Sequence, residues 1–214
     1  MATNPVILIL GAGPRIGASV ADQFALDGYK VAIASRSGTD TKNEKGFFSL
    51  KADLGKAGSI PTIFDAVKTE FHAAPSVVVY NAPAFTYPPD KDSALSIPVE
   101  SFVADLNVNT VSPYVAAQQA IAGWETLPKE SKKSFIYTGN ILNVSIFPVA
   151  MMLDLGTRGF RFFYGDERTE DGKIIGKDVD GSAHAEFYAQ LAKQEGDIPW
   201  QATFVKGKGY VAFN

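Results

Sequence analysis

The stretch from Val6 to Gly17 constrains the fold of this 214-residue chain more than any other. Its first part, Val6-Ile7-Leu8-Ile9-Leu10, is a continuous apolar run that predicts a buried strand. A glycine turn follows, Gly11-Ala12-Gly13-Pro14-Arg15-Ile16-Gly17, and apolar residues then recur at helical spacing up to Gly28. A strand, glycine turn and helix can hold a dinucleotide, because glycine lets the backbone approach the pyrophosphate and the helix N-terminus offers unpaired N–H groups. The alternative for a lone match is an ordinary strand-to-helix turn.

Apolar strand-like runs alternate with helical patterns along the chain, which predicts βαβ units and a parallel sheet. We expect further strands at residues 29–35, 47–52, 76–80, 134–138 and 160–164, and helices at 60–71, 99–124 and 182–194. The predicted fold class is α/β, a Rossmann-type doubly wound sheet with helices on both faces, in a single domain over residues 1–214. The expected inner face of the 99–124 helix carries Phe102, Leu106, Asn109, Tyr114, Ala117 and Ile121.

Composition excludes several classes of function. A net charge of -3 gives no basic face for nucleic acid. The absence of cysteine excludes disulfides and thiolate metal sites, and with only His72 and His184 we expect no metal. No apolar run reaches the length of a membrane span, and the first strand follows no leader-like segment, so we expect a cytoplasmic protein without a membrane partner.

The end of the second predicted strand bears on the choice of cofactor. In this fold a carboxylate there accepts a hydrogen bond from the ribose 2′-OH, whereas an arginine accommodates a 2′-phosphate. Ser35 and Arg36 occupy this place, and no acid follows until Asp40. The pattern favours NADP(H) over NAD, with a solvated loop charge as the alternative interpretation of Arg36.

Several motifs, taken in order, resemble those of the short-chain dehydrogenase/reductase family, over residues 6–164. The matching positions are the glycines of the turn (Gly11, Gly13, Gly17), the adenine-side pair Asp53-Leu54, the sheet motif Asn81-Ala82, and the helix residue Asn109 with Tyr114 and Gln118. The resemblance implies that the turn, including Arg15 and Ile16, contacts the cofactor. Arg15 replaces the expected middle glycine, where it would either reach a 2′-phosphate or crowd the pyrophosphate. The stretches 137–143 and 163–168 look like a divergent fungal branch of the family.

The catalytic positions of the family differ in this chain. The resemblance places the catalytic Ser at Asn140, the Tyr at Leu153 and the Lys at Thr157, so that only Asn109 is retained. Reduction of a carbonyl needs a proton donor within hydrogen-bond reach of its oxygen. The nearest polar candidates for substrate contacts are Thr138, Asn140 and Tyr164, while Tyr137 is expected to point to the face opposite Thr138.

The interval between Asn140 and Phe160 is too short for the long helix that normally connects two parallel strands. Either the crossover helix after the fifth strand is missing or shortened in the protein, or a segment near Gly156-Thr157 is missing from the sequence. We favour the second, because loss of the helix would expose a sheet face that must otherwise be covered.

Two functions remain open at this point. The first is an NADP(H)-dependent reductase of a small carbonyl or imine compound. The second is a degenerate NADP-binding relative with a scaffold, regulatory or non-redox role, such as an isomerase or cyclase. The resemblance also implies a homo-oligomer, a dimer or tetramer formed through the helices after the fourth and fifth strands. We expect His184 at the surface or in a cap, and 166–168 in a solvated charged loop.

Overall fold

A computed structural model describes residues 4–90, 96–139 and 161–213. Within these residues nine strands form one sheet in the order β3-β4-β2-β1-β5-β6-β7-β8-β9. The strands are β1 (Val6–Leu10), β2 (Lys30–Ser35), β3 (Thr41–Lys42), β4 (Phe48–Lys51), β5 (Val77–Tyr80), β6 (Ser134–Thr138), β7 (Arg161–Arg168), β8 (Gln201–Val205) and β9 (Gly209–Tyr210). All pairings from β4 to β8 are parallel, and β3 and β9 add short antiparallel edges.

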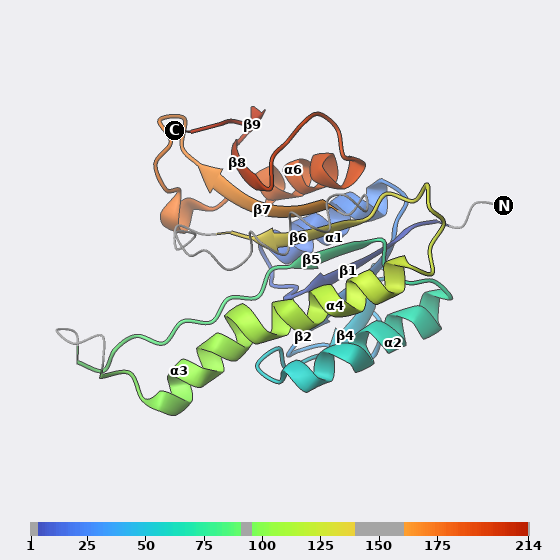
Figure 1. Ribbon diagram of the computed structural model, residues 1–214, viewed down its shortest axis with the longest axis horizontal. Helices are drawn as coiled ribbons and strands as arrows, with labels where there is room; N and C mark the ends of the chain where they lie inside the picture. Colours follow the sequence, from blue (N-terminus) through green and yellow to red (C-terminus); the bar gives the residue numbers. More distant parts are fainter. Residues whose placement is uncertain (1–3, 91–95, 140–160, 214) are drawn as a thin grey trace.

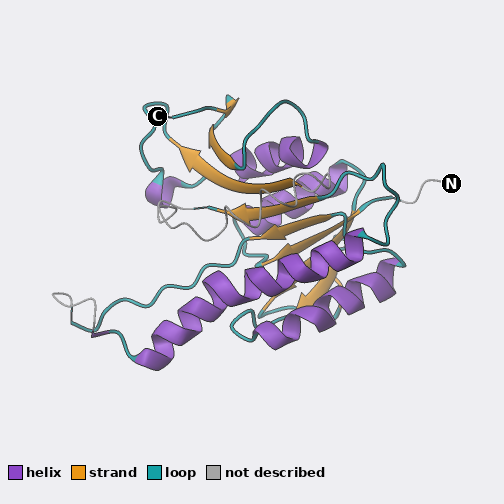
Figure 2. Ribbon diagram, viewed as in Figure 1, coloured by secondary structure: helices purple, strands orange, loops and turns teal. Residues whose placement is uncertain are grey.

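Helices cover both faces of this sheet, which confirms the predicted α/β Rossmann-type fold (Figures 1 and 2). They are α1 (Ile16–Leu26), α2 (Ile60–Phe71), α3 (Val99–Leu106), α4 (Ser112–Trp124) and α6 (Gly181–Lys193), with short helical turns at Ala57–Ser59 and Gly176–Asp178. One face packs against α1 and α6, and the other against α2 and α4. In the described part of the chain, no helix is long and apolar enough to cross a membrane.

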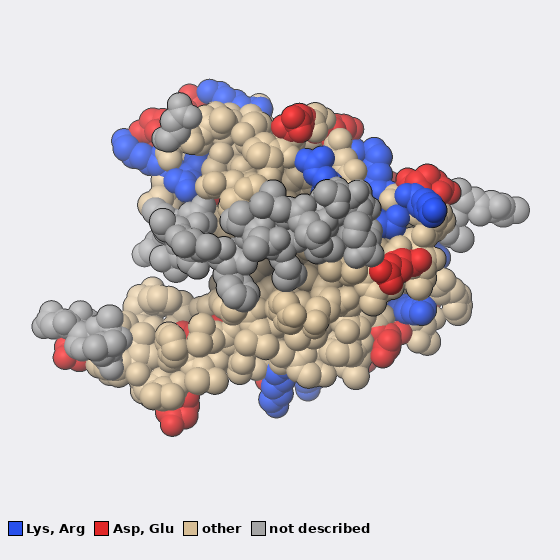
Figure 3. Space-filling view, viewed as in Figure 1, with Lys and Arg blue, Asp and Glu red and all other residues tan. Residues whose placement is uncertain are grey.

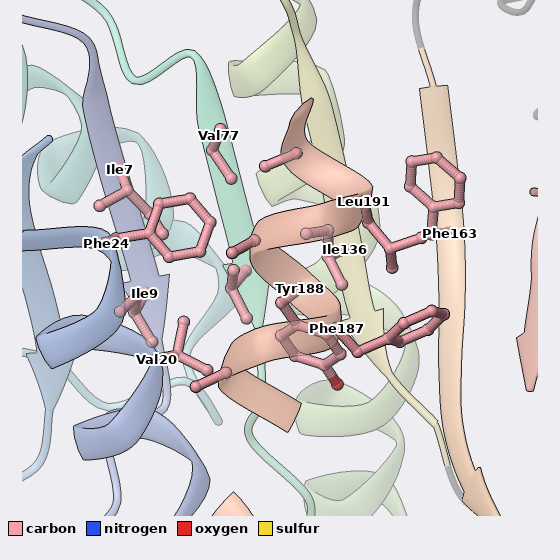
Figure 4. Packing of buried hydrophobic residues seen from close by; sticks show 14 of the residues in the cluster. Ile7, Ile9, Val20, Phe24, Val77, Ile136, Phe163, Phe187, Tyr188 and Leu191 are labelled. Carbon is pink, nitrogen blue, oxygen red and sulfur yellow. The ribbon is translucent and has the colours of Figure 1, made fainter. Parts of the chain in front are cut away.

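The apolar run of β1 is continuous because both of its faces are buried. Leu8 and Leu10 pack toward α2 and α4, whereas Ile7 and Ile9 pack toward α1 and α6. Figure 4 shows this second cluster, in which the side chains of α1 and α6 close over the sheet. The chain leaves β1 toward β2 and β4 and returns through β5 to its other side, so the order of strands reverses between β1 and β5. Ligands of open α/β sheets bind at such a reversal, beyond the carboxyl ends of the strands.

The helix predicted over residues 99–124 is present, and of the face predicted to be buried, Ala117 is buried and Ile121 packs against the core, whereas the positions nearer the N-terminus are wrong. Phe102 and Tyr114 are 53% and 45% exposed. The buried residues of this helix all lie in α4 and are Ser112, Pro113, Ala116, Ala117, Ala120 and Trp124. Two causes are visible: a π-helical turn at Asn107–Val111 shifts the helical phase between α3 and α4, and α3 extends beyond the sheet (Figure 1).

Strand β7 extends four residues beyond its predicted end at Tyr164. Its carboxyl half pairs with β8 from Tyr164↔Gln201 to Arg168↔Val205, whereas its pairing with β6 stops at Thr138↔Gly165. Residues 166–168 are therefore in a strand, and the prediction of a solvated loop is wrong. The interval that follows β6, with Asn140 and the crossover predicted to lack its helix, lies within residues 140–160, outside the described residues.

Candidate cofactor and active site

The glycine turn ties the carboxyl ends of three strands together. The N–H of Gly11 donates to the carbonyl of Ala34 at 3.0 Å, and the side-chain amide of Asn81 donates to the carbonyl of Gly11 at 2.9 Å. Gly11 has a φ of +94°, and a Cβ added there would lie 2.7 Å from the backbone nitrogen of Ala82. Gly11 and Asn81-Ala82 thus meet at the point where the order of strands reverses.

The other two glycines of the turn have different surroundings. A Cβ on Gly17 would lie 2.6 Å from the Cα of Ala12, so this glycine lets α1 pack closely on the turn. A Cβ on Gly13 would meet nothing within 4 Å. Open space at Gly13 beside the first turn of α1 is the geometry in which a pyrophosphate reaches backbone N–H groups.

Arg15 and Ile16 form the entry to α1. Arg15 occupies the N-cap position without a side-chain cap, and Ile16 is the first helical residue. The backbone of Arg15 also contacts the start of α6, because a Cβ on Gly181 would lie 3.1 Å from its carbonyl oxygen. The first turns of α1 and α6 therefore lie side by side at the carboxyl end of the sheet.

Ser35 and Arg36 lie at the carboxyl end of β2. Arg36 is exposed, and the hydroxyl of Ser35 is 3.2 Å from that of Ser37. Asp40, the first acid after this strand, accepts a hydrogen bond from the backbone of Lys51 at 2.9 Å. Its carboxylate therefore helps to close the loop between β2 and β4, and the residues directly after β2 carry a positive charge.

Asp53 and Leu54 follow β4 and differ in burial. Asp53 is exposed, and its carboxylate accepts from the backbone of Gly55 at 3.1 Å. Leu54 is buried, and its carbonyl accepts from the hydroxyl of Ser112 at 2.6 Å. The leucine fixes the loop to α4, which leaves the aspartate at the surface of the carboxyl edge.

Asn109 lies in the π-helical turn and is fully engaged with the backbone of Ala84. Its side-chain oxygen accepts from the N–H of Ala84 at 3.0 Å, and its side-chain nitrogen donates to the carbonyl of the same residue at 2.7 Å. A π turn leaves carbonyls without their usual helical partners. Here Tyr80 donates to the carbonyl of Val108 at 2.6 Å, and Tyr137 donates to that of Asn109 at 3.1 Å.

Three tyrosines stack side by side on this face of the sheet. Tyr80, Tyr137 and Tyr164 are in register on β5, β6 and β7, and neighbouring rings are nearly parallel, with centroids 5.5 and 6.2 Å apart. Burial raises the pKa of Tyr80 and of Tyr137 above the usual value. Both phenols therefore remain protonated donors near neutral pH.

Thr138 lies on the other face of the sheet, as strand alternation predicts relative to Tyr137. Its hydroxyl accepts a hydrogen bond from Tyr188 of α6 at 3.0 Å. The structure therefore does not bring Thr138 together with Asn109. The third candidate for catalysis, Asn140, lies outside the described residues.

A group of buried titratable residues in β7 and α6 was not predicted from the sequence. Asp166 and Glu167 are each 4% exposed and His184 is 2% exposed, so the prediction of a surface histidine is wrong. Asp166 pairs with Arg168 at 2.6 Å, and Glu167 accepts from the N–H of Asp180 at 2.9 Å. The signal available was the alternation of polar and apolar residues in β8, from Gln201 to Phe204, which is typical of a strand and provides β7 with a partner.

The buried histidine joins β7 to the start of α6. Its Nδ1 lies 2.8 Å from the carbonyl of Asp180 and 3.3 Å from the carboxylate of Glu167. Burial lowers the pKa of His184 and raises that of Glu167. Among the residues that the structure describes, no three His, Asp or Glu side chains form a group suited to a metal ion.

The site thus combines a glycine turn open to a ligand, a basic strand end and a tyrosine-lined sheet face, which is the arrangement of a nucleotide-binding Rossmann protein. Among curated proteins, the chain is 36% identical to the short chain dehydrogenase/reductase dmxR12 of Cryptosporiopsis sp. (strain 8999), over 99% of this chain and 96% of that protein. This chain belongs to the short-chain dehydrogenase/reductase family. No protein-family profile matches it.

Solved structures agree on the fold. A Serratia marcescens short-chain dehydrogenase/reductase double mutant superposes with a TM-score of 0.74 at 19% identity, covering 96% of this chain and 98% of that one. The 3-ketoacyl-(acyl-carrier-protein) reductase of Brucella melitensis, in complex with NADH, has a TM-score of 0.73 at 19% identity and coverages of 95% and 96%. A Burkholderia cenocepacia J2315 short chain dehydrogenase in complex with NADP has a TM-score of 0.71 at 19% identity and coverages of 96% and 97%.

The fungal relative also differs from this chain in length. Their alignment spans 240 positions, which exceeds the 214 residues of this chain by 26. At least that many positions of the relative therefore have no counterpart here. A gap of this size is as long as a crossover helix with its loops.

Proposed function

We propose that the chain is an NADP(H)-dependent reductase of a small carbonyl or imine compound. The open backbone at Gly13, beside the N-terminus of α1, supports cofactor binding more directly than any other observation. The bound nicotinamide would supply the hydride. The chain would hold the pyrophosphate at its glycine turn and the adenine end near Asp53-Leu54.

The preference for a 2′-phosphate rests on Arg36. This exposed arginine follows β2, and Asp40, the next acid, is engaged with Lys51. A charge-assisted hydrogen bond contributes about 1.5–3 kcal/mol, or roughly 10- to 150-fold in affinity. We therefore expect Arg36→Glu to raise the KM for NADPH by a factor in this range with little effect on NADH. Lys68→Glu, the same charge change in the last turn of α2, serves as the control.

The reaction needs another proton donor, because Leu153 and Thr157 occupy the positions where the resemblance expects Tyr and Lys. We propose Tyr164, whose ring lies on the same face as the tyrosines that contact the Asn109 turn. It would donate its phenolic proton to the substrate oxygen as the hydride reaches the carbon. Removal of a general acid typically costs 10²- to 10⁴-fold in rate, which Tyr164→Phe would test.

A second candidate function is cofactor binding without redox turnover. It is favoured by Leu153 and Thr157 at the positions where the resemblance expects Tyr and Lys, and by the length difference from the fungal relative. The two are separated by titrating the protein with NADPH and then following absorbance at the nicotinamide band with a panel of ketones, aldehydes and imines. Sustained oxidation excludes the second candidate, and tight binding without oxidation excludes the first.

We further propose that the protein acts in the cytoplasm as a homo-oligomer that uses neither nucleic acid nor membrane. The projecting end of α3 supports self-association, since Val99, Val103 and Leu106 are 71%, 47% and 41% exposed on one helix. In Figure 3 this end shows a largely uncharged surface. Light scattering of the purified protein tests this, and a monomer at micromolar concentration would exclude it.

A further inference from the structure

The segment that follows β5 is laid out as an extended strap along α3. The strap comprises residues 83–88, and it runs beside α3 away from the sheet (Figure 1). Two side chains one helical turn apart hold its backbone: Asn109 pairs with Ala84, and Asp105 accepts from the N–H of Thr86 at 2.6 Å. Bonds to alternate residues fix which side of the strap faces the helix.

The outward side of the strap carries two aromatic rings. Burial alternates along it, and Phe85 and Tyr87 are 64% and 80% exposed. The rings contact each other edge to face, with centroids 4.9 Å apart and an interplanar angle of 86°. The backbone between the two rings is tied to α3 through Thr86, which sets the side of the strap from which both rings project. Two exposed rings in contact form a contiguous apolar patch, which is the kind of surface that marks an interaction site.

The position and charge of the strap indicate what it binds. It begins two residues after Asn81, which contacts the glycine turn, so Phe85 lies within about 14 Å of Asn81 along an extended chain. Residues 81–89 contain no charged side chain, and the carboxylate of Asp105 is used by the strap backbone. The strap thus starts beside the glycine turn and offers ring faces and edges without an ionic partner. These properties fit an uncharged, planar aromatic molecule.

We propose that Phe85 and Tyr87 form a docking face for the aromatic ring system of the substrate, which makes the substrate class neutral, planar aromatic ketones. This inference rests on the proposed reductase function for its place at the active site. Binding of an aromatic ketone to this docking face can be measured whether or not the protein oxidises NADPH.

The experiment measures binding of 1-tetralone and cyclohexanone to the full chain by ligand-observed NMR, with and without NADP⁺. We expect 1-tetralone to bind more tightly than cyclohexanone. Phe85→Ala and Tyr87→Ala should each raise the Kd for 1-tetralone at least about fivefold. Tyr87→Phe should restore binding to within about twofold, because the ring and not the hydroxyl carries the contact. Leu26→Ala, an exposed apolar residue at the far end of α1, should change nothing.

The outcomes separate this inference from the reductase proposal. Loss of 1-tetralone binding in the strap variants supports the docking face even if NADPH is never oxidised. An unchanged Kd in both variants overturns it even if the protein reduces ketones. So does a wild-type protein that does not bind 1-tetralone. A shift of oligomeric state in the alanine variants by light scattering also overturns it, since the rings would then be a subunit contact.

Discussion

The hydrogen bond between Tyr188 and Thr138 offers a test of which face of β6 matters for activity. Tyr188 is fully buried in α6, and its hydroxyl donates to the hydroxyl of Thr138 at 3.0 Å. Burial raises the pKa of Tyr188 well above its usual value, so it remains a donor throughout the working pH range. Thr138→Val keeps the shape of the side chain and removes the acceptor.

The expected loss in the free energy of unfolding differs between the two single variants, because Tyr188 is more deeply buried than Thr138. In Thr138→Val the buried phenol of Tyr188 loses its partner, which costs about 1–3 kcal/mol of the free energy of unfolding. In Tyr188→Phe the hydroxyl that remains is on Thr138, which is only half-buried, so we expect about 0.5–1.5 kcal/mol. The double variant leaves neither group unpaired and should cost less than the sum of the two single changes.

Urea denaturation of the four proteins gives the coupling energy of this pair. We expect at least about 0.5 kcal/mol of non-additivity. In parallel, kcat/KM for any active ketone should stay within about threefold in Thr138→Val, because this hydroxyl faces α6 and not the Asn109 turn. Strict additivity would refute the hydrogen bond, and a loss in kcat/KM of a hundredfold or more, as for removal of a catalytic proton-transfer group, would refute its structural role.

Three further predictions follow from the described geometry. Gly11→Ala should lower the Tm and abolish cofactor binding because of its positive φ and the contact with Ala82, whereas Gly13→Ala should keep the Tm and weaken cofactor binding at least about tenfold; equal effects in calorimetry and titration would contradict this. His184 has a lowered pKa in the folded protein, so the unfolded chain binds more protons below pH 6.5 and the free energy of unfolding should fall there as pH decreases. The difference between wild type and His184→Asn across pH 5–7 isolates this effect, and a flat difference would contradict it. Asp166→Ala should cost about 1–3 kcal/mol in urea, because it removes the buried carboxylate that pairs with half-buried Arg168, and a loss below about 0.5 kcal/mol would show that the pair contributes little to stability.

The sequence predicted the parallel sheet well because its strands are buried on both faces. A continuous β-branched run such as Val77-Val78-Val79 is suited to the centre of a sheet, where both of its faces are buried. The glycine turn after β1 lies beside the end of β5, where Asn81 donates to the carbonyl of Gly11. Burial of each strand and the geometry of the glycine turn can therefore be predicted from each short segment of sequence alone. The assignment to the short-chain dehydrogenase/reductase family followed from their order.

The remainder depended on partners that are distant in sequence. Asp166 and Glu167 look like solvent-exposed charges until β8 is placed beside them, and His184 looks peripheral until α6 packs on β7. The part of the 99–124 face predicted before the π turn was wrong because a π turn cannot be recognised from apolar spacing, which assumes a constant phase. The roles of the predicted cofactor residues and of Asn109 remain predictions.

The π turn makes the helix after the strap serve two different surfaces. Beyond the turn, α4 follows the sheet, and before it, α3 follows the strap through Asp105. Deleting one residue within Asn107–Val111 would restore an unbroken α-helix and leave Asp105 facing nearly the same way, because a five-residue π turn rotates the chain about as far as four α-helical residues. What the deletion would remove is the π turn itself, whose carbonyls accept from Tyr80 and Tyr137, so it should disturb the tyrosine face and leave the contact of Asp105 with the strap in place.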